Sequence, residues 1–470
     1  MARALCIRGT FLHTPNLGDL DILHDYLLVT DRLGIIVHFQ SALLPESQKL
    51  LESWSSHCLV LPSGTFLVPS FVDLHLHAAQ FLYQGNGLHL PLMEWLNEYA
   101  FKAEERLDAD PSLARRVYSR LARRLIQNGT GAVLLFGTIN EETNLILAQV
   151  MQAAGLRAFV GKLSMDISSR PSYKEESAQT ALEAARSFVD KCHGLTSHMP
   201  AHKRTVEPVL TPRFVPTCSD ELLVGLGKMS ANEDLKIQSH LAEALDQVQF
   251  VRTERGAEDM DIFDRSGLLT SRTIQAHCTF LDVPCFKHIY SRGTAVAHCP
   301  LSNSYFSAEP FRLREALDEG VKVGLGTDIA GGYSLDLQNC MRHAVSVSRM
   351  RQGSKQVAVA NGAAEDDGRS LAIDWKEALY LATRGGAAAL GLATGVFEAG
   401  IPFDAQEIRV FDSRTGVGAL DFFDLEVSSE PADGEALTID MVEKWWGLGD
   451  ERNRVNVWVQ GSKLDISSVL

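Results

Sequence analysis

Short apolar runs alternate with amphipathic stretches along most of this chain. Eight runs rich in apolar or β-branched residues, each ending in polar or small residues, predict strands. They occupy residues 65–77, 129–137, 156–165, 208–216, 235–243, 273–280, 293–300 and 321–328. The stretches between most of them, such as PSLARRVYSRLARRLIQNG and NLILAQVMQAAG, predict helices closed by a glycine.

This alternation of strands and helices predicts parallel strands. Eight strands are the number that a closed (β/α)8 barrel needs, although a doubly wound open sheet would give a similar alternation. The two chain ends depart from the repeat. DYLLVTDRLGIIVHF near the N-terminus predicts a hairpin, and GIPFDAQEIRVFD and RVNVWVQG near the C-terminus are also β-type.

We therefore expect an α/β chain with two domains. A (β/α)8 TIM-type barrel would span residues 69–397. A small β-sandwich domain would be built from residues 1–68 and 398–470.

One polar segment, CHGLTSHMPAHKRTVE (192–207), precedes the fourth predicted strand and carries three histidines. Long loops are often functional or mobile. We consider three interpretations of this loop: a second metal site, an active-site lid or a solvated insertion.

Composition narrows the class of protein. The 59 acidic and 44 basic residues among 470 give a formal charge of −15, which repels a phosphate backbone, so nucleic acid is not an expected partner. The eight cysteines form no CxxC pair, which predicts free thiols in a reducing compartment. The N-terminus does not resemble a signal peptide, and no run of about 18 apolar residues occurs. We expect a cytoplasmic protein without a membrane partner.

The first barrel strand ends in the segment DLHLH (73–77). Side chains alternate along a strand, so His75 and His77 lie on the same face, and two imidazoles at a barrel mouth can hold one divalent metal. An HxH pair alone is also compatible with a structural role.

Further candidate ligands end three other predicted strands, namely His240, His277 and Asp328. The strand ends of a barrel converge on one rim, so these residues are expected to meet. His240 would add a third nitrogen ligand, a set that suits zinc but also iron, cobalt or nickel. Asp328 can bind the metal and accept a proton from its water, and His277 can bind the metal or that water. Glu243 is either a proton donor past the strand end or an exposed residue at a helix start.

Several segments together resemble the amidohydrolase superfamily, and within it the guanine deaminase family most closely. The resemblance covers nearly the whole chain, most strongly from about residue 60 to 400. It rests on PSFVDLHLHAAQ (69–80), LPLMEWLNEYAFKAEERL (90–107), TPRFVPTCSD (211–220), QSHLAE (238–243), AHC (276–278), AHCPLSNSYF (297–306) and GLGTDIAGGYS (324–334). The metal motif indicates only the superfamily. The HxxQ, LPLxEWL and TPRFxPxCS motifs are more specific and indicate the guanine deaminase family.

The resemblance implies one Zn²⁺ per subunit, bound by four side chains: His75, His77, His240 and Asp328. His277 would lie beside or on the metal, and Glu243 would shuttle protons. The purine would be held by Gln80, Arg213 and Phe214. Arg213 could instead form a strand-end ion pair. Trp95 either walls the pocket or packs in the core, and His298 would only support the site.

The implied reaction is zinc-dependent hydrolytic deamination of guanine to xanthine and ammonia. Metal-bound hydroxide would attack C2, with Asp328 and His277 orienting it and Glu243 protonating N3. Guanine and water are the expected partners, in a homodimer. The alternatives are a related amidohydrolase that deaminates or dechlorinates an adenosine-type or triazine heterocycle, and a catalytically silent barrel that serves as a binding scaffold. The HxE and PCxxC pair of cytidine deaminases is absent from the sequence.

Overall fold

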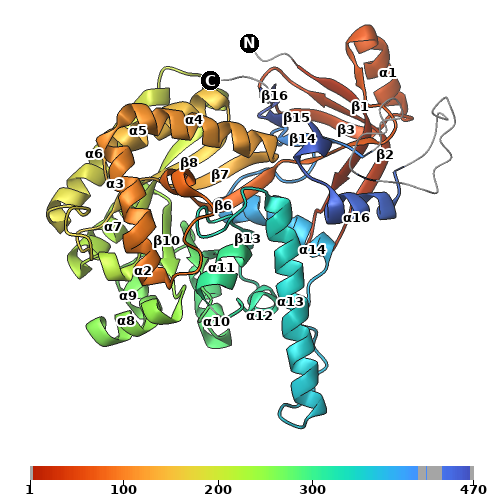
Figure 1. The fold of residues 1–470 in the computed structure, drawn as a ribbon. Coiled ribbons are helices and arrows are strands. Elements are labelled where there is room, and N and C mark those ends of the chain that lie inside the picture. Colours follow the sequence, from red (N-terminus) through yellow and green to blue (C-terminus); the bar gives the residue numbers. More distant parts are fainter. Residues whose placement is uncertain (1–3, 308, 411–419, 421–436, 466–470) are drawn as a thin grey trace. The chain divides into compact units, whose positions relative to one another are not determined.

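The computed structural model describes residues 4–307, 309–410, 420 and 437–465 (Figure 1). By their internal contacts they group into two compact units. One comprises Asp73–Ala122 and Val133–Asp374, and the other comprises Met1–Val72, Arg123–Ala132 and Trp375–Leu470.

Eight barrel strands lie side by side in the order in which they occur along the chain. From β8 to β13, each strand pairs in parallel with the next one. The eight strands are β6 (Phe71–His77), β7 (Thr130–Phe136), β8 (Arg157–Ser164), β9 (Val206–Pro212), β10 (Ile237–Leu241), β11 (Thr273–His277), β12 (Ala295–His298) and β13 (Val323–Leu325). Seven of the eight predicted runs contain one of these strands, and the first run also contains β5 (Thr65–Pro69). The fourth run, 208–216, overlaps β9, which begins two residues earlier at Val206.

Hydrogen bonds between β6 and the segment after β13 complete the barrel. The amide of Asp328 donates to the carbonyl of His75 at 2.8 Å, and the amide of His77 donates to the carbonyl of Ile329 at 3.0 Å. The last strand therefore returns to the first, which decides between the closed barrel and the open sheet that the sequence left as alternatives.

Helices connect the barrel strands, and the predicted amphipathic stretches form α4 and α5. Asn140 caps α5 by accepting a hydrogen bond from the Glu142 amide, and Gly155 ends it in the left-handed conformation. The helices are α2 (Leu92–Trp95), a π-helical turn (Leu96–Ala100), α3 (Phe101–Ala109), α4 (Pro111–Gln127), α5 (Glu141–Ala154), α6 (Ala178–Thr196), α7 (Asp220–Glu233), α8 (Leu245–Arg255), α9 (Asp259–Arg265), α10 (Val283–Arg292), α11 (Pro300–Phe306), α12 (Leu313–Asp318) and α13 (Leu337–Ala360).

The small β-sandwich expected from the chain ends takes the form of one mixed sheet in the order β16-β15-β14-β5-β1-β2-β3, with β4 beside β1. Its strands are β1 (Cys6–His13), β2 (Asp21–Thr30), β3 (Ile36–Ser41), β4 (Leu59–Val60), β5, β14 (Ala405–Arg409), β15 (Arg454–Val459) and β16 (Ser462–Lys463). The predicted hairpin is confirmed as the antiparallel pair of β2 and β3. Residues 1–3, 411–419, 421–436 and 466–470 of the predicted small domain lie outside the described residues.

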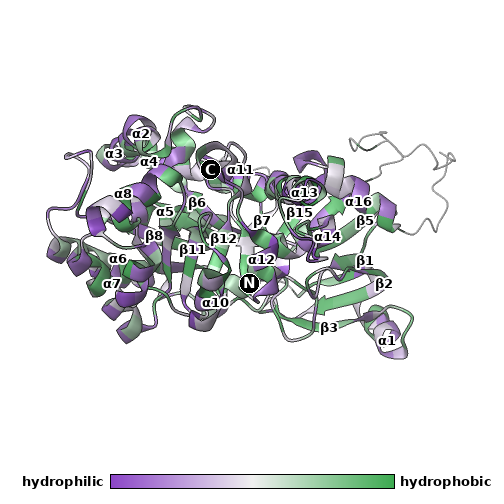
Figure 2. Cartoon of the chain, turned by 90° about the horizontal axis from the view of Figure 1, so that it is seen from below, coloured by the Kyte–Doolittle hydropathy of each residue, from purple (hydrophilic) through white to green (hydrophobic). Residues whose placement is uncertain are grey.

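An apolar core holds the terminal sheet together, and Figure 2 shows β1, β2 and β3 as mostly hydrophobic. Phe11, Leu28, Leu67, Phe403 and Trp458 are all buried in one cluster. The same unit contains α1 (Pro45–Trp54), α14 (Trp375–Tyr380), α15 (Gly386–Leu390) and α16 (Ile439–Leu448).

The histidine-bearing segment 192–207 is only partly a loop. Its first five residues form the last turn of α6, because the apolar periodicity of that helix continues through Cys192 and Thr196, which are both buried. His193 and His198 are exposed. The groups of possible metal ligands found among the described residues do not include this segment.

The eight cysteines are free thiols, six of them buried. Among the described residues, no helix is both long enough and apolar enough to cross a membrane.

Candidate active site

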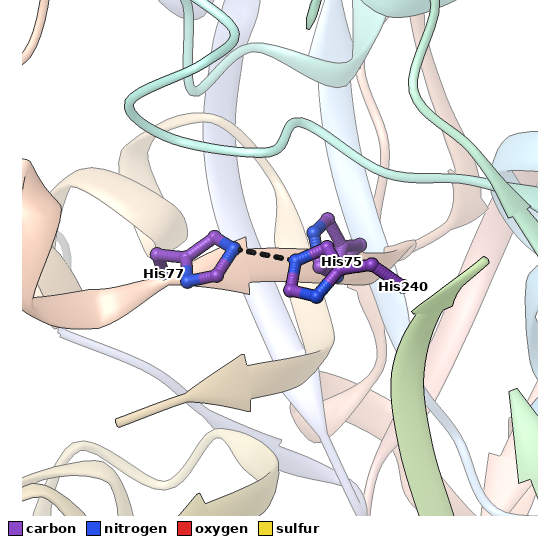
Figure 3. A group of neighbouring side chains, drawn as sticks. All are labelled: His75, His77 and His240. Atoms are coloured by element: carbon purple, nitrogen blue, oxygen red, sulfur yellow. Dashed lines mark hydrogen bonds between the residues drawn. The ribbon is translucent and has the colours of Figure 1, made fainter. Parts of the chain in front are cut away.

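Three histidines from two strands meet inside the barrel mouth (Figure 3). His75 and His77 come from the end of β6, and His240 comes from β10. The Nε2 atoms of His77 and His240 lie 3.0 Å apart, and their rings are stacked with centroids 5.1 Å apart. The ring of His75 stands edge-on at 4.8 Å from that of His240. The same-face geometry expected of the HxH motif is present.

These three imidazoles are neutral. Burial, reinforced by the neighbouring histidines, lowers the pKa of His77 and His240 well below the ordinary value, and burial does the same to His75. The carbonyl of Arg213 can only accept, so Nδ1 of His240 donates to it at 2.5 Å, which leaves the lone pair on Nε2. Nε2 of His75 makes no hydrogen bond with any described residue.

Asp328 adds a carboxylate oxygen to the three nitrogens. Its Oδ1 lies 3.1 Å from Nε2 of His75 and 3.6 Å from Nε2 of His77. One ligand atom from each histidine falls within 4.8 Å of those from the other two. Three neutral imidazoles gathered in one group, with the Asp328 carboxylate beside two of them, fit a divalent metal such as zinc.

His277 lies on the other side of the Asp328 carboxylate. The Oδ1 of Asn303 can only accept, so Nδ1 of His277 donates to it at 2.9 Å, which leaves Nε2 as an acceptor. That Nε2 lies 3.7 Å from Oδ2 of Asp328 and 3.5 Å from Oε1 of Glu243. Burial lowers the pKa of His277, although Asp328 opposes this, so the ring is available as a neutral base.

Glu243 is buried rather than exposed at a helix start, and α8 begins only at Leu245. Its amide donates to Oε1 of Gln247 at 3.0 Å, and its carbonyl accepts from the hydroxyl of Ser307 at 2.6 Å. Burial raises the pKa of Glu243 well above the ordinary value, and the charge of Asp328 adds to this effect. A carboxyl group that holds its proton beside a metal site can act as a general acid.

Backbone strain is concentrated at these strand ends. His277 has φ 68°, Asp328 has φ 49° and Ala242 has φ 47°. Non-glycine residues seldom adopt this left-handed region, and such conformations cluster at functional sites. Ala242 and Asp328 lie just past β10 and β13, and His277 is the last residue of β11.

A small pocket opens beside the histidines. It contains all four side chains predicted to contact a purine, and its lining is His77, Gln80, Leu92, Trp95, Leu96, Arg213, Phe214, His240, Glu243, Ser302, Phe306, Asp328 and Gly331. A Cβ at Gly331 would lie 2.8 Å from Oγ of Ser302 and 2.9 Å from Oδ2 of Asp328, so a larger residue there would displace one of these side chains.

Arg213 lines the pocket and also forms a buried ion pair. Its Nη1 donates to Oε2 of Glu104 at 2.6 Å, whereas its Nη2 makes no hydrogen bond with a described residue. Oε1 of Glu104 accepts from Nε2 of Gln80 at 3.1 Å, and Oε1 of Gln80 accepts from the Ala330 amide at 3.1 Å. The ion pair considered for Arg213 is therefore present, although its partner lies on α3, and the same side chain also lines the pocket.

Trp95 likewise both walls the pocket and packs in the core. Its ring lies 5.0 Å from that of Phe306 and 5.7 Å from that of Tyr83. Phe214 places its ring 6.1 Å from that of His240. His298 is buried against Phe311 and is not part of the pocket lining.

Sequence reasoning missed Glu104, Asn303 and Ser302. Glu104 lies inside an amphipathic stretch where acidic residues are common, and its only signal was its place on the buried face of that helix. Asn303 and Ser302 lie in the HCPLSN run, where only His298 attracted attention.

A closed parallel barrel with histidines and an aspartate gathered at its strand ends defines a class of metal-dependent hydrolases. The amidohydrolase family model matches residues 66–463, and the chain belongs to this family.

Within it the chain groups with the guanine deaminases. It is 35% identical to the guanine deaminase of Mus musculus, over 98% of this chain and 96% of that one. A guanine deaminase from C. acetobutylicum, solved with guanine bound in its active site, has a TM-score of 0.83 and 28% identity, over 98% and 100% of the two chains. A zinc-bound adenosine deaminase from Xanthomonas campestris, 20% identical with a TM-score of 0.74 over 98% and 92% of the chains, shares the fold.

Proposed function

We propose that this protein is a hydrolase that converts guanine and water to xanthine and ammonia. The observation that carries this proposal is the arrangement of one pocket. The same pocket is lined by His77, His240 and Asp328, by Glu243, whose pKa is raised, and by Arg213, whose Nη2 makes no hydrogen bond with a described residue. The similarity to the guanine deaminases of Mus musculus and C. acetobutylicum supports guanine as the substrate.

The four ligands proposed for a single zinc ion are His75, His77, His240 and Asp328. A zinc ion bound there would act as a Lewis acid and lower the pKa of a water molecule to about 7. His240 is held for this task by its Nδ1 hydrogen bond to the Arg213 carbonyl, since that bond fixes the tautomer and the ring orientation.

Asp328 and His277 are the proposed acceptors of the water proton. The tautomer set by Asn303 leaves Nε2 of His277 without a proton, on the side that faces Asp328. Glu243 is proposed to deliver its proton to N3 of guanine as the water oxygen bonds to C2. The second proton of the water then passes to the amine nitrogen, the C2–N bond breaks, and ammonia leaves. The first proton of the water returns from Asp328 or His277 to Glu243, which restores the starting state. Burial of all three side chains excludes bulk water from these transfers.

Gln80, Arg213 and Phe214 are proposed to hold the purine, with Trp95 closing one side. Gln80 and Arg213 provide hydrogen-bond donors, and Phe214 and Trp95 provide apolar ring surface. Glu104 occupies Nη1 of Arg213, so Nη2 can still donate to a substrate carbonyl.

The boundaries 1–68 with 398–470, and 69–397, are proposed for the two domains, and truncation at these boundaries followed by limited proteolysis would test them. The homodimer and the cytoplasmic location also stay predictions. Light scattering and cell fractionation would test them.

An ultraviolet time course of guanine conversion by the purified chain, with ammonia measured in parallel, tests the proposed function. We expect conversion to xanthine with one ammonia per guanine, and none in a metal-stripped sample. Zinc-loaded protein that leaves guanine untouched would contradict the proposal, and adenosine-type and triazine substrates would then be screened.

A further inference from the structure

Glu104 occupies a position in the site that the proposed reaction does not use. It lies on α3, is fully buried and is not among the residues that line the pocket. Its two oxygens nevertheless hold two different pocket side chains, Nε2 of Gln80 at 3.1 Å and Nη1 of Arg213 at 2.6 Å. Because Glu104 binds Gln80 and Arg213 but does not line the pocket, it can affect a ligand only through these two side chains.

The orientation of the Gln80 amide follows from this contact. A carboxylate only accepts, so the Gln80 NH₂ group must face Glu104, and its Oε1 accepts from the Ala330 amide at 3.1 Å. Turning the amide over would place an oxygen against the carboxylate and an NH₂ group against an N–H. The Glu104 and Ala330 contacts therefore fix both ends of the Gln80 amide. The second N–H of Nε2 remains as a donor for a ligand.

Arg213 is held in a comparable way. Glu104 occupies Nη1, and the ring of Phe101 lies 4.8 Å from the guanidinium carbon. Nη2 makes no hydrogen bond with a described residue, although the arginine is 1% exposed. A buried donor without a partner is costly, which favours a ligand acceptor at this position.

Two fixed donors suit one edge of a purine. The edge that carries N7 and the 6-substituent offers two acceptors in a 6-oxopurine such as guanine, whereas a 6-aminopurine places an NH₂ donor there. We propose that Glu104 is a positioning residue that keeps this side of the pocket donor-only and so selects 6-oxopurines. This inference rests on the proposed function only for the identity of the substrate, because the donor pattern itself can be tested by binding.

The test uses zinc-loaded protein and two ligands that differ in the 6-oxo group and in the N1 proton that accompanies it. Hypoxanthine has the 6-oxo group, and unsubstituted purine lacks it. Dissociation constants from calorimetry are compared for the unmodified protein, Glu104→Gln and the control Glu105→Gln. Glu105 is adjacent but pairs with Arg170 at the half-exposed surface, so its substitution should leave both constants unchanged.

We expect Glu104→Gln to weaken hypoxanthine binding by about ten- to a hundredfold and purine binding by no more than about threefold. Equal weakening of both ligands would overturn the inference in favour of a general structural role. So would an unmodified protein that binds hypoxanthine no more tightly than purine.

Removing one member of a buried ion pair can also prevent folding. Glu104→Asp keeps the charge beside Arg213 but shortens the side chain, so it cannot hold both partners as before. We expect it to weaken hypoxanthine binding selectively as well, by a smaller factor. Selective hypoxanthine binding without guanine turnover would contradict the proposed function and leave this inference standing.

Discussion

The Nε2 atoms of His77 and His240 face each other at 3.0 Å, and at least the second of them carries a lone pair rather than a proton. Two neutral imidazoles gain little from such an approach unless a proton or a cation lies between their nitrogens. The adjacent Asp328 oxygen makes a cation the better occupant, because it supplies negative charge within the same cluster.

This contact predicts that the metal stabilises the fold as well as supporting the reaction. We expect one zinc per chain by elemental analysis, and a chelator should remove activity and lower the melting temperature, because a ligand that binds only the folded state stabilises it. His77→Ala should lose the metal, whereas the exposed His89→Ala should retain it. Full activity in protein shown to be free of metal would contradict the assignment.

Glu243→Gln should lower kcat for guanine by about 10² to 10⁴-fold, since the amide cannot donate the proton that the buried carboxyl holds. Zinc content should not change, because Glu243 is not a proposed ligand. Glu254→Gln, an exposed glutamate on α8, provides the matched control. A Glu243→Gln variant with nearly unchanged kcat would assign the proton transfer to another group.

Thr327→Val should reduce the free energy of unfolding by about 1–3 kcal/mol. The Thr327 hydroxyl donates to Oδ2 of Asp73 at 2.5 Å, and its amide donates to Oδ1 at 3.0 Å, which joins the last barrel strand to the first. Burial raises the pKa of Asp73 to about 7 while these bonds lower it, so the variant leaves a buried carboxylate less well satisfied. Urea denaturation measures the difference. Thr205→Val, whose hydroxyl makes only a 3.4 Å contact, should change stability little.

Asp108 should make the protein less stable as the pH rises. Burial raises its pKa to about 6, against the opposing hydrogen bond from Thr138. The unfolded value is about 3.9. Between these values the folded chain retains a proton that the unfolded chain has released, so the free energy of unfolding falls with increasing pH in this window.

Asp108→Asn removes this titration. When the pH rises from about 4.5 to about 7, the free energy of unfolding should fall less for this variant than for the unmodified protein. The difference should be roughly 1 to 2 kcal/mol. Denaturation curves at both pH values, with the exposed Asp190→Asn as control, provide the measurement. Parallel pH dependence of the Asp108 variant and the unmodified protein would contradict this account.

Local sequence determined the elements and the candidate chemistry of this protein. The β-branched runs predicted all eight barrel strands, because a buried parallel strand requires nearly continuous apolar residues. The two-residue period of a strand placed His75 and His77 on one face, and strand-end positions identified His240, His277 and Asp328.

Only the tertiary structure decided what depends on contacts between distant segments. The closure of the barrel rests on backbone bonds from Asp328 and Ile329 to β6, which no local pattern encodes. The tautomers of His240 and His277 depend on Arg213 and Asn303 from other elements. Glu104 could not be identified from its own helix, since an acidic residue on an amphipathic helix is ordinary until folding buries it between Gln80 and Arg213. Hydrophobic periodicity is a property of neighbours in sequence, whereas hydrogen-bond partners and buried charge pairs are properties of neighbours in space.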